Sequence, residues 1–366
     1  MDEAARQQMF RGHLILAPMT KGSNLPFRRL CVELGARFAV GEMALSRRVV
    51  RRAAGELALL RRHPDENIFG VQLCGRFPDV MARAAVLAQE RGADFVDVNL
   101  GCPIDSVVRH GEGAALMTRP RRLTQILEAM RKVLTVGLSV KLRSGWTEDK
   151  PLAVSLAKLA QDAGADAVAL HARSRTQRYR RPADWDLIGE VAAAVDIPVI
   201  GNGDIIRGKE AAERMRQTGC ASVMTARGAL VKPWLFREAA EDADVDLSGT
   251  ERMDLLRRYV AMALEHFGED ERGRKKVRFF LDWHLDFFCR WVPSLEGAAP
   301  FHLQERHAGF EPRDDDEALL ARTDLAAREY LVRLLVDGPE AAGEMPGPAP
   351  PGAPKAGRDH RKEITG

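Results

Sequence analysis

The sequence has few cysteines, and no two of them form a C-x-x-C pair. The five lie far apart, at Cys31, Cys74, Cys102, Cys220 and Cys289. An odd number without short spacings argues against a disulfide framework and against a cysteine zinc site, so we expect no metal site. Free thiols are typical of a reducing compartment, so we expect a cytoplasmic protein.

Long apolar runs and a strong charge imbalance are also absent. The first residues, "MDEAARQQMFRGH", lack the apolar region of a signal peptide, and no run approaches the roughly 18 apolar residues of a membrane span. We therefore expect no membrane attachment. Lys and Arg total 55 against 52 Asp and Glu, so any nucleic-acid surface must be a local patch. A length of 366 residues predicts two folded parts.

The sequence does contain a repeat. Four segments, starting at Glu33, Glu90, Asp162 and Gln217, each combine a helix end, a glycine and a short apolar strand. Four further apolar strands lie at 13–19, 68–75, 138–145 and 198–205, and helical patterns such as 78–91, 120–134 and 184–195 separate the strands. This alternation predicts a parallel α/β fold, a (β/α)8 TIM barrel over about residues 10–241. An open doubly wound sheet is disfavoured, because "APMTKGSN" after the first strand is not G-x-G-x-x-G.

Beyond residue 248 the pattern is helical only, over 251–267, 275–292 and 316–336. In the second segment, Val277, Phe280, Leu281, His284 and Phe288 recur at helical spacing and predict one buried stripe. A Pro- and Gly-rich stretch with a charged end then predicts a disordered tail. We expect a barrel domain at 1–245, a smaller all-helical domain at 246–336 and the tail at 337–366.

Polar residues interrupt the apolar strands where the strands end. Because the carboxyl ends of parallel barrel strands share one mouth, we expect these residues to meet there and form a functional site. Glycines near Gly203 and Gly228, in the last two strands, suit a close approach of backbone N–H groups to a phosphate. The polar strand ends are Pro18, Met19, Glu42, Gln72, Asn99, Cys102, Lys141, Arg143, His171, Arg173, Asn202, Gly203, Asp204, Ala226 and Arg227.

Several of these motifs together resemble the tRNA-dihydrouridine synthases. The strings "LAPM", "VQLCG", "VDVNLGCPIDSVVRHGEGAAL", "SVKLRSG", "LHARSR", "GNGDI" and "MTARGALVKPWLF" occur in the order and spacing of that family, over roughly residues 10–335. "HARSRTQRY" and "RFFLDWHLDFFCRW" are most similar to the branch whose eukaryotic members modify the tRNA variable loop. Those members carry Cys/His zinc fingers before the barrel, a motif that this sequence does not show.

The resemblance implies an FMN-dependent enzyme that reduces specific uridines in tRNA to 5,6-dihydrouridine, with NADPH as reductant. It implies an FMN-binding barrel at 1–245, a helical RNA-binding domain at 246–336, and no protein partner. Lys141 is the natural partner for negative charge on reduced FMN, and Arg227 for the phosphate. By resemblance, the flavin contacts are Ala17, Pro18, Met19, Gln72, Lys141, His171, Asn202, Gly203, Asp204, Ala226 and Arg227, and Asn99 is a candidate contact to flavin or uracil.

Cys102 is the candidate catalytic acid. A hydride delivered from N5 of the flavin to C6 of uracil leaves C5 to be protonated, and a thiol with an ordinary pKa of about 8.5 is protonated at neutral pH. Taken alone, such a cysteine reads more readily as a small buried hydrophobe. Gly101 and Pro103 favour the catalytic interpretation, because they shape a turn that carries the thiol into the mouth. The other four cysteines are interpreted as packing residues.

Basic residues near the mouth are candidates for gripping RNA, because a uridine must leave its stack to be reduced. The predicted RNA contacts are Arg143, Arg173, Arg175, Arg178, Tyr179 and Arg180 near the barrel mouth, and Lys275 and Lys276 in the helical domain. Two alternatives remain open. One is a small-molecule flavin oxidoreductase of the dihydropyrimidine or dihydroorotate type, which explains neither the arginine-rich loop nor the helical domain. The other is an RNA-binding protein whose barrel lacks catalysis.

Overall fold

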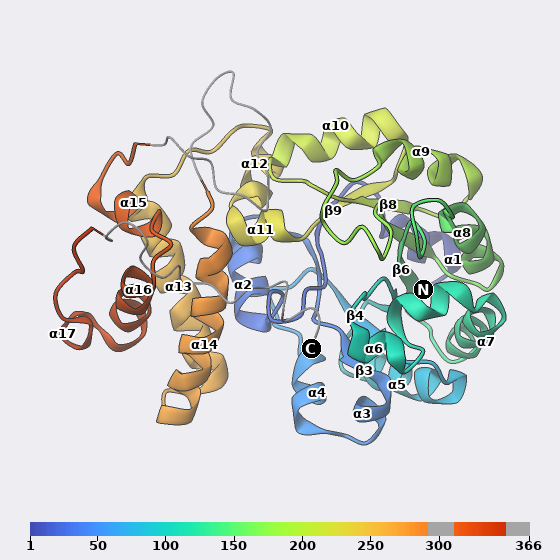
Figure 1. Ribbon diagram of the computed structural model, residues 1–366. Coiled ribbons are helices and arrows are strands. Elements are labelled where there is room, and N and C mark those ends of the chain that lie inside the picture. Colours follow the sequence, from blue (N-terminus) through green and yellow to red (C-terminus); the bar gives the residue numbers. More distant parts are fainter. Residues whose placement is uncertain (292–310, 349–366) are drawn as a thin grey trace.

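The computed structural model describes residues 1–291 and 311–348. Its centre is a parallel barrel (Figure 1). The strands neighbour one another in the order β2-β1-β9-β8-β7-β6-β5-β4, and pairing of Phe38 with Ile68 closes the ring from β2 to β4. The barrel strands are β1 (Leu14–Leu16), β2 (Phe38–Val40), β4 (Ile68–Cys74), β5 (Phe95–Leu100), β6 (Gly137–Arg143), β7 (Ala167–His171), β8 (Val199–Asn202) and β9 (Ser222–Thr225). A two-residue strand, β3 (Ala44–Leu45), pairs with the end of β4. The predicted TIM barrel is confirmed.

Helices surround the barrel, and the longer ones each bury one face against it. The main ones are α2 (Leu25–Glu33), α5 (Pro78–Glu90), α7 (Pro120–Arg131), α8 (Ala153–Asp162), α9 (Trp185–Ala194), α10 (Gly208–Thr218) and α12 (Leu235–Glu241). Shorter ones are α1 (Glu3–Gln8), α3 (Ser46–Val50), α4 (Ala54–Leu59), α6 (Asp105–Arg109), α11 (Arg227–Val231) and a 3₁₀ helix at Gly113–Thr118. In α7, Leu123, Ile126, Leu127 and Met130 are buried, which is the spacing of one helix face. None of the helices in the described ranges is long and apolar enough to cross a membrane.

The inside of the barrel is apolar at the amino ends of the strands. Phe10, Phe38 and Phe95 fill that end, with the Phe10 and Phe95 ring centroids 5.1 Å apart. Gly70 makes room for this packing, because a Cβ there would lie 2.1 Å from the Phe95 ring. Polar side chains begin above this layer, at Asp97 and Ser139. The apolar floor confines polar chemistry to the other end of the barrel.

The carboxyl-terminal region is helical, as predicted, and lies to one side of the barrel beside α2 (Figure 1). It contains α13 (Gly249–Phe267), α14 (Glu271–Phe288), α15 (Asp315–Leu320) and α16 (Leu325–Asp337). The segment 316–336, expected to be helical throughout, is in fact two helices. The break occurs because the Asp324 carboxylate accepts a hydrogen bond from the Ala327 N–H and so starts a new helix at Leu325.

One apolar cluster joins these helices to the barrel. Phe27 and Leu30 of α2 share it with Leu256 and Tyr259 of α13 and with Leu281 of α14. The predicted stripe on α14 is buried at Val277, Leu281, His284 and Phe288. Phe280 is only half-buried, which corrects that part of the expectation, and its ring stacks on Phe267 with centroids 5.1 Å apart.

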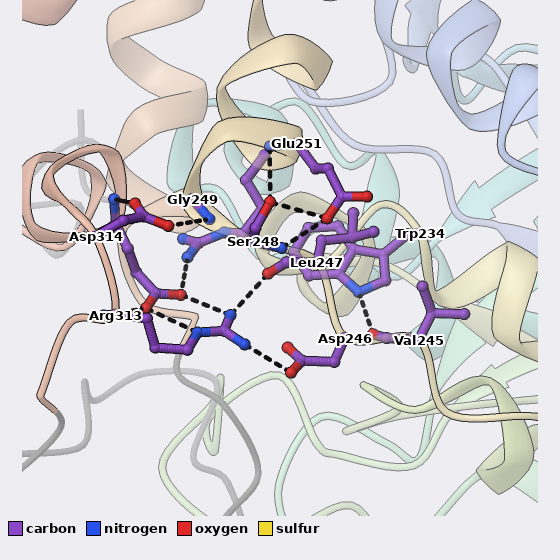
Figure 2. A network of polar contacts seen from close by, with 11 residues as sticks. Trp234, Val245, Asp246, Leu247, Ser248, Gly249, Glu251, Arg313 and Asp314 are labelled. Atoms are coloured by element: carbon purple, nitrogen blue, oxygen red, sulfur yellow. Dashed lines mark hydrogen bonds and ion pairs between the residues drawn. The ribbon is translucent and has the colours of Figure 1, made fainter.

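A polar junction fixes the start of α13 (Figure 2). Arg313 donates to the Asp246 carboxylate at 2.7 Å and to the Leu247 carbonyl at 2.9 Å. The Gly249 N–H donates to Asp314, and a Cβ at Gly249 would lie 2.1 Å from that carboxylate, so only glycine fits. Ser248 and Glu251 form a capping box at the same point. These contacts tie the segment before α13 to the start of α15.

The predicted tail is described only in part. Residues 339–342 form a short helix, α17 (Pro339–Ala342), where disorder was expected. Residues 349–366 of the predicted tail, and residues 292–310 of the predicted helical domain, lie outside the described part of the chain.

Candidate active site

The predicted cofactor and catalytic residues lie where the barrel strands end, at one mouth. Strand register sets their heights: Asn99 is paired with Lys141, Arg143 with His171, and His171 with Asn202. Residues two apart on a strand point to the same side, so Asp97 and Asn99 both face the barrel interior. The parallel sheet therefore brings polar groups from distant parts of the sequence to one place.

A chain of hydrogen bonds runs from the barrel interior to the Cys102 turn. Ser139 Oγ donates to Asp97 Oδ1 at 2.7 Å, and Gln72 Nε2 donates to Asp97 Oδ2 at 2.7 Å. Asn99 Nδ2 then donates to Gln72 Oε1 at 2.8 Å. The Asn99 Oδ1 atom accepts from the backbone N–H groups of Gly101 at 3.2 Å and Cys102 at 2.9 Å. We call this set the Asp97 chain.

Cys102 is the most accessible of the five free cysteines. It is half-buried, whereas Cys31, Cys74, Cys220 and Cys289 are buried, in keeping with their interpretation as packing residues. Gly113, with φ of +58°, packs against this turn, and a Cβ there would lie 3.1 Å from the Cys102 Cβ. Burial raises the pKa of the Cys102 thiol, while the Ile104 N–H and the Arg143 guanidinium act in the opposite direction. The thiol therefore holds its proton at neutral pH.

Lys141 and His171 face the interior beside this turn. Lys141 Nζ donates to Asn202 Oδ1 at 3.0 Å, and Asn202 Nδ2 donates to the Met224 carbonyl at 2.8 Å. Burial lowers the pKa of Lys141 to about 8, an effect that the Asp97 carboxylate opposes. Burial and the nearby cations Arg143 and Lys141 lower the pKa of His171 well below its usual value, so the imidazole is neutral.

The hydrogen bond of His171 also indicates its tautomer. Its Nε2 atom lies 3.3 Å from Arg173 Nη1. Because a guanidinium only donates, Nε2 is the acceptor and Nδ1 carries the hydrogen. The site therefore presents an uncharged N–H donor at this position.

Arg173, one of the predicted RNA contacts, is buried. Its Nη2 atom donates to both oxygens of Asp204, at 2.8 and 2.7 Å, and its Nε donates to the Arg181 carbonyl at 2.6 Å. Asp204 has a left-handed backbone with φ of +54°. Arg173 thus holds the loop after β8 against the loop after β7.

Arg143, another of the predicted RNA contacts, is buried as well. Its Nε donates to the Gly101 carbonyl at 2.9 Å, and its Nη1 donates to the Ser174 carbonyl at 3.1 Å. The side chain therefore joins the Cys102 turn to the loop of residues 174–181, which we call the arginine loop.

The rest of the arginine loop lies nearer the surface. Arg175 is half-buried, donates to Asp105 at 2.8 Å and lies over the Trp146 ring at 4.4 Å. Tyr179 lies beside the predicted cofactor site, with the Arg227 guanidinium 4.0 Å from its ring centroid. Arg178 is half-buried and Arg180 is exposed. Of the predicted arginines on this loop, Arg178 and Arg180 are therefore the better placed to reach RNA.

The remaining predicted contacts occupy the ends of β1, β8 and β9. Ala17 is hydrogen-bonded through its N–H to the Thr225 carbonyl, and Pro18 and Met19 follow it, half-buried. Arg227 follows Ala226 and lies 3.8 Å from Asp204. A Cβ at Gly203 would lie 2.2 Å from Ala183, and one at Gly228 would lie 1.9 Å from the Ile205 carbonyl oxygen. Packing within the chain thus explains both glycines without a phosphate.

The predicted RNA contacts in the helical domain, Lys275 and Lys276, are exposed on α14. Phe279, one turn further on the same helix, is 37% exposed, and Lys21 of the β1–α2 loop lies over its ring at 5.0 Å. This part of α14 therefore borders the loop at the barrel mouth.

Sequence reasoning missed Asp97, Ser139 and Trp146. The signal for Asp97 was present, because a carboxylate two residues before Asn99 in an apolar strand must share its face. The position of Trp146 over Arg175 depends on loop geometry and had no such signal. Within the described ranges, no group of three or more His, Cys, Asp and Glu side chains is arranged to hold a metal ion.

Comparison with known proteins adds to this geometry. Residues 15–291 match the family described as Dihydrouridine synthase (Dus). The chain is 47% identical over 315 residues to a human protein named as a tRNA-dihydrouridine(47) synthase-like protein, with NAD(P)(+) in its name. It is 42% identical over 318 residues to a protein of the same name from Oryza sativa subsp. japonica. Each alignment covers 85% of this chain but only 48% and 46% of those relatives, so the chain spans about half their length.

The fold also resembles a solved structure. The 6-hydroxypseudooxynicotine amine oxidase from Pseudomonas geniculata N1 matches with a TM-score of 0.50 at 12% identity, covering 63% of this chain and 47% of that chain. At this identity the likeness concerns the fold alone.

Proposed function

Because the chain belongs to the dihydrouridine synthase family, we propose that it reduces specific uridines in tRNA to 5,6-dihydrouridine, using bound FMN and NADPH. The observation that carries this proposal is the half-buried thiol of Cys102, held at the same mouth as Lys141, Asn99 and His171. Relatives at 47% and 42% identity are named for position 47, so that nucleotide is the first candidate target. A cytoplasmic location belongs to the same proposal.

The donors at the mouth fit FMN, whose ring and phosphate both accept hydrogen bonds. Lys141 forms one hydrogen bond among the described residues, which leaves two of its N–H donors for a ligand. Arg227 adds a second cation, and His171 adds a neutral donor. We assign the ring contacts to Gln72, Asn99, Lys141, His171 and Asn202, the edge contacts to Ala17, Pro18 and Met19, and the phosphate contacts to Gly203, Asp204, Ala226 and Arg227.

When bound, FMN would supply the hydride for C6 of uracil. Cys102 supplies the other hydrogen as a proton to C5, so the two additions saturate the C5–C6 bond. A raised pKa suits this task, because an acid must hold its proton until negative charge develops on the base. The positive charge of Lys141 lies on the strand next to Asn99 and stabilises negative charge in the site.

RNA binding requires cations that are free to reach phosphates. Arg178 and Arg180 beside the mouth, and Lys275 and Lys276 on α14, meet this condition. They lie on the barrel and on the helical region respectively, so an RNA that contacts both spans the two parts. We propose these residues, with Arg175 and Tyr179, as the RNA-binding set.

The test is a reconstituted reaction of the full chain with NADPH, FMN and tRNA that lacks dihydrouridine, followed by sequencing of dihydrouridine sites. The proposal predicts conversion at one or a few uridines. Reduction of free uracil or oxidation of dihydroorotate, with tRNA unchanged, would instead identify a small-molecule oxidoreductase. RNA binding by a colourless protein that takes up no flavin would identify a non-catalytic RNA-binding protein.

A further inference from the structure

The donor-to-acceptor direction of the hydrogen bonds in the Asp97 chain is determined by the groups at its two ends. At the inner end, the Asp97 carboxylate only accepts hydrogen bonds, so Gln72 must turn its NH₂ group toward it. At the outer end, the backbone N–H groups of Gly101 and Cys102 only donate, so Asn99 must turn its carbonyl toward them. Gln72 Oε1 and Asn99 Nδ2 then meet as acceptor and donor. Each amide has a single orientation that satisfies both neighbours.

Asp97 lies too deep to touch a substrate. It is 3% exposed and lies two residues before Asn99 on β5, nearer the apolar floor of the barrel. Its oxygens are bonded to Gln72 Nε2 and Ser139 Oγ, both of them buried. Asp97 therefore acts on the reaction only through its neighbours, by orienting Gln72 and by its charge near Lys141.

The Cys102 turn depends on that orientation. The turn follows directly after β5, and Asn99 holds it by two hydrogen bonds to successive backbone N–H groups. If Gln72 lost its acceptor, its amide would be free to rotate, and Asn99 would lose the partner that keeps its carbonyl toward the turn. The position of the thiol is thus linked to a carboxylate five residues away in the sequence, through side chains of β4 and β5.

We propose that Asp97 is a positioning residue that sets the place of the Cys102 thiol through Gln72 and Asn99. This inference rests on the proposed function for the use of the thiol in catalysis, but its structural part does not. The Asp97 chain requires a hydrogen-bond acceptor at position 97. Asparagine can supply one by directing its carbonyl to Gln72 while Ser139 accepts from its NH₂ group. Leucine, which is similar in size, cannot.

The experiment measures hydrogen exchange at the Gly101 and Cys102 amides in the full chain without added flavin. In Asp97→Leu, both amides should exchange about fivefold to tenfold faster than in the wild type, the loss expected for one hydrogen bond each. In Asp97→Asn they should remain close to wild type. The rate at which iodoacetamide alkylates Cys102, measured by peptide mass spectrometry, should differ from the wild-type rate in Asp97→Leu. In Asp97→Asn it should equal the wild-type rate.

Two further variants separate positioning from general damage. Asp94→Leu removes a carboxylate from the start of the same strand, where it accepts from the Phe69 N–H, and should lower stability without faster exchange at Gly101 and Cys102. Gln72→Met interrupts the Asp97 chain at its middle residue and should give the same faster exchange at Gly101 and Cys102 that is expected for Asp97→Leu. It provides the test if Asp97→Leu does not fold. Unchanged exchange in a folded Asp97→Leu or Gln72→Met protein would overturn the inference. An active Cys102→Ala enzyme would overturn the catalytic role alone and leave these exchange results standing.

Discussion

Arg173 holds Asp204 through one guanidinium nitrogen that donates to both carboxylate oxygens, at 2.8 and 2.7 Å. Arg173 comes from the loop after β7, and Asp204 from the loop after β8. The same Asp204 carboxylate also accepts from the Ala183 N–H at 2.8 Å. One ion pair therefore sets the relative position of two loops at the mouth.

We expect Arg173→Ala to destabilise the protein by about 3 kcal/mol, the lower end of the range for breaking a buried pair, because Asp204 is partly exposed. Flavin content should fall, since the loop that carries Gly203 and Asp204 loses its anchor. Thermal unfolding and absorbance of the purified protein check this. Arg180→Ala, at an exposed position, is the control and should change stability by less than about 0.5 kcal/mol. Equal stability of the two variants would contradict the anchoring role.

The arginine loop should contribute to RNA affinity through phosphates rather than bases. Each lost phosphate contact reduces the slope of log affinity against log salt by roughly 0.7–0.9. Replacing Arg178 and Arg180 by Ala should therefore weaken tRNA binding and flatten its salt dependence, with flavin content unchanged. Arg37→Ala is the matched control, because Arg37 is an exposed arginine just before β2, at the opposite end of the barrel. A salt slope that is the same in all three proteins would place the RNA elsewhere.

Lys141 should make flavin retention depend on pH. Burial lowers its pKa from the usual 10.5 to about 8, so the ammonium is charged below about pH 8 and loses its charge as the pH rises through that value. Flavin affinity should therefore fall between pH 7 and pH 9. Lys141→Met should bind flavin about tenfold or more weakly at pH 7, as expected for a charge-assisted hydrogen bond, and should show no such transition. Equilibrium dialysis between pH 7 and pH 9 measures the flavin affinity of both proteins. If the pH transition persists in Lys141→Met, a group other than Lys141 causes it.

The architecture could be predicted from the sequence because parallel barrel strands are apolar on both faces and stand out as short uninterrupted runs. Strand ends such as Asn99, Lys141 and His171 were predictable for the same reason, since a polar residue in such a run is conspicuous. The start of a new helix at Asp324 was not recognised, because apolar spacing continues on both sides of it. Its capping carboxylate was the local signal.

The roles of the arginines could not be predicted from the sequence. Arg143, Arg173 and Arg180 look alike there, yet two of them are buried against backbone carbonyls or Asp204 and one is exposed. Which arginine turns inward depends on the carbonyl groups that the loops present, and loop geometry is not encoded in apolar spacing. The same holds for Gly203, whose lack of a side chain is required by the approach of Ala183, a residue from another loop.

Substitution of Cys102 gives the most direct measurement of the proposed reaction. Cys102→Ala should bind FMN and allow NADPH to reduce it, because neither step uses the thiol. Stopped-flow absorbance without oxygen measures the rate at which tRNA lacking dihydrouridine reoxidises the reduced enzyme. This rate should fall by a factor of about 10² to 10⁴, the contribution of a general acid. Cys74→Ala and Cys220→Ala replace buried cysteines and should reoxidise like the wild type. A Cys102→Ala enzyme that is reoxidised by tRNA at the wild-type rate would contradict the assignment of Cys102 as the proton donor.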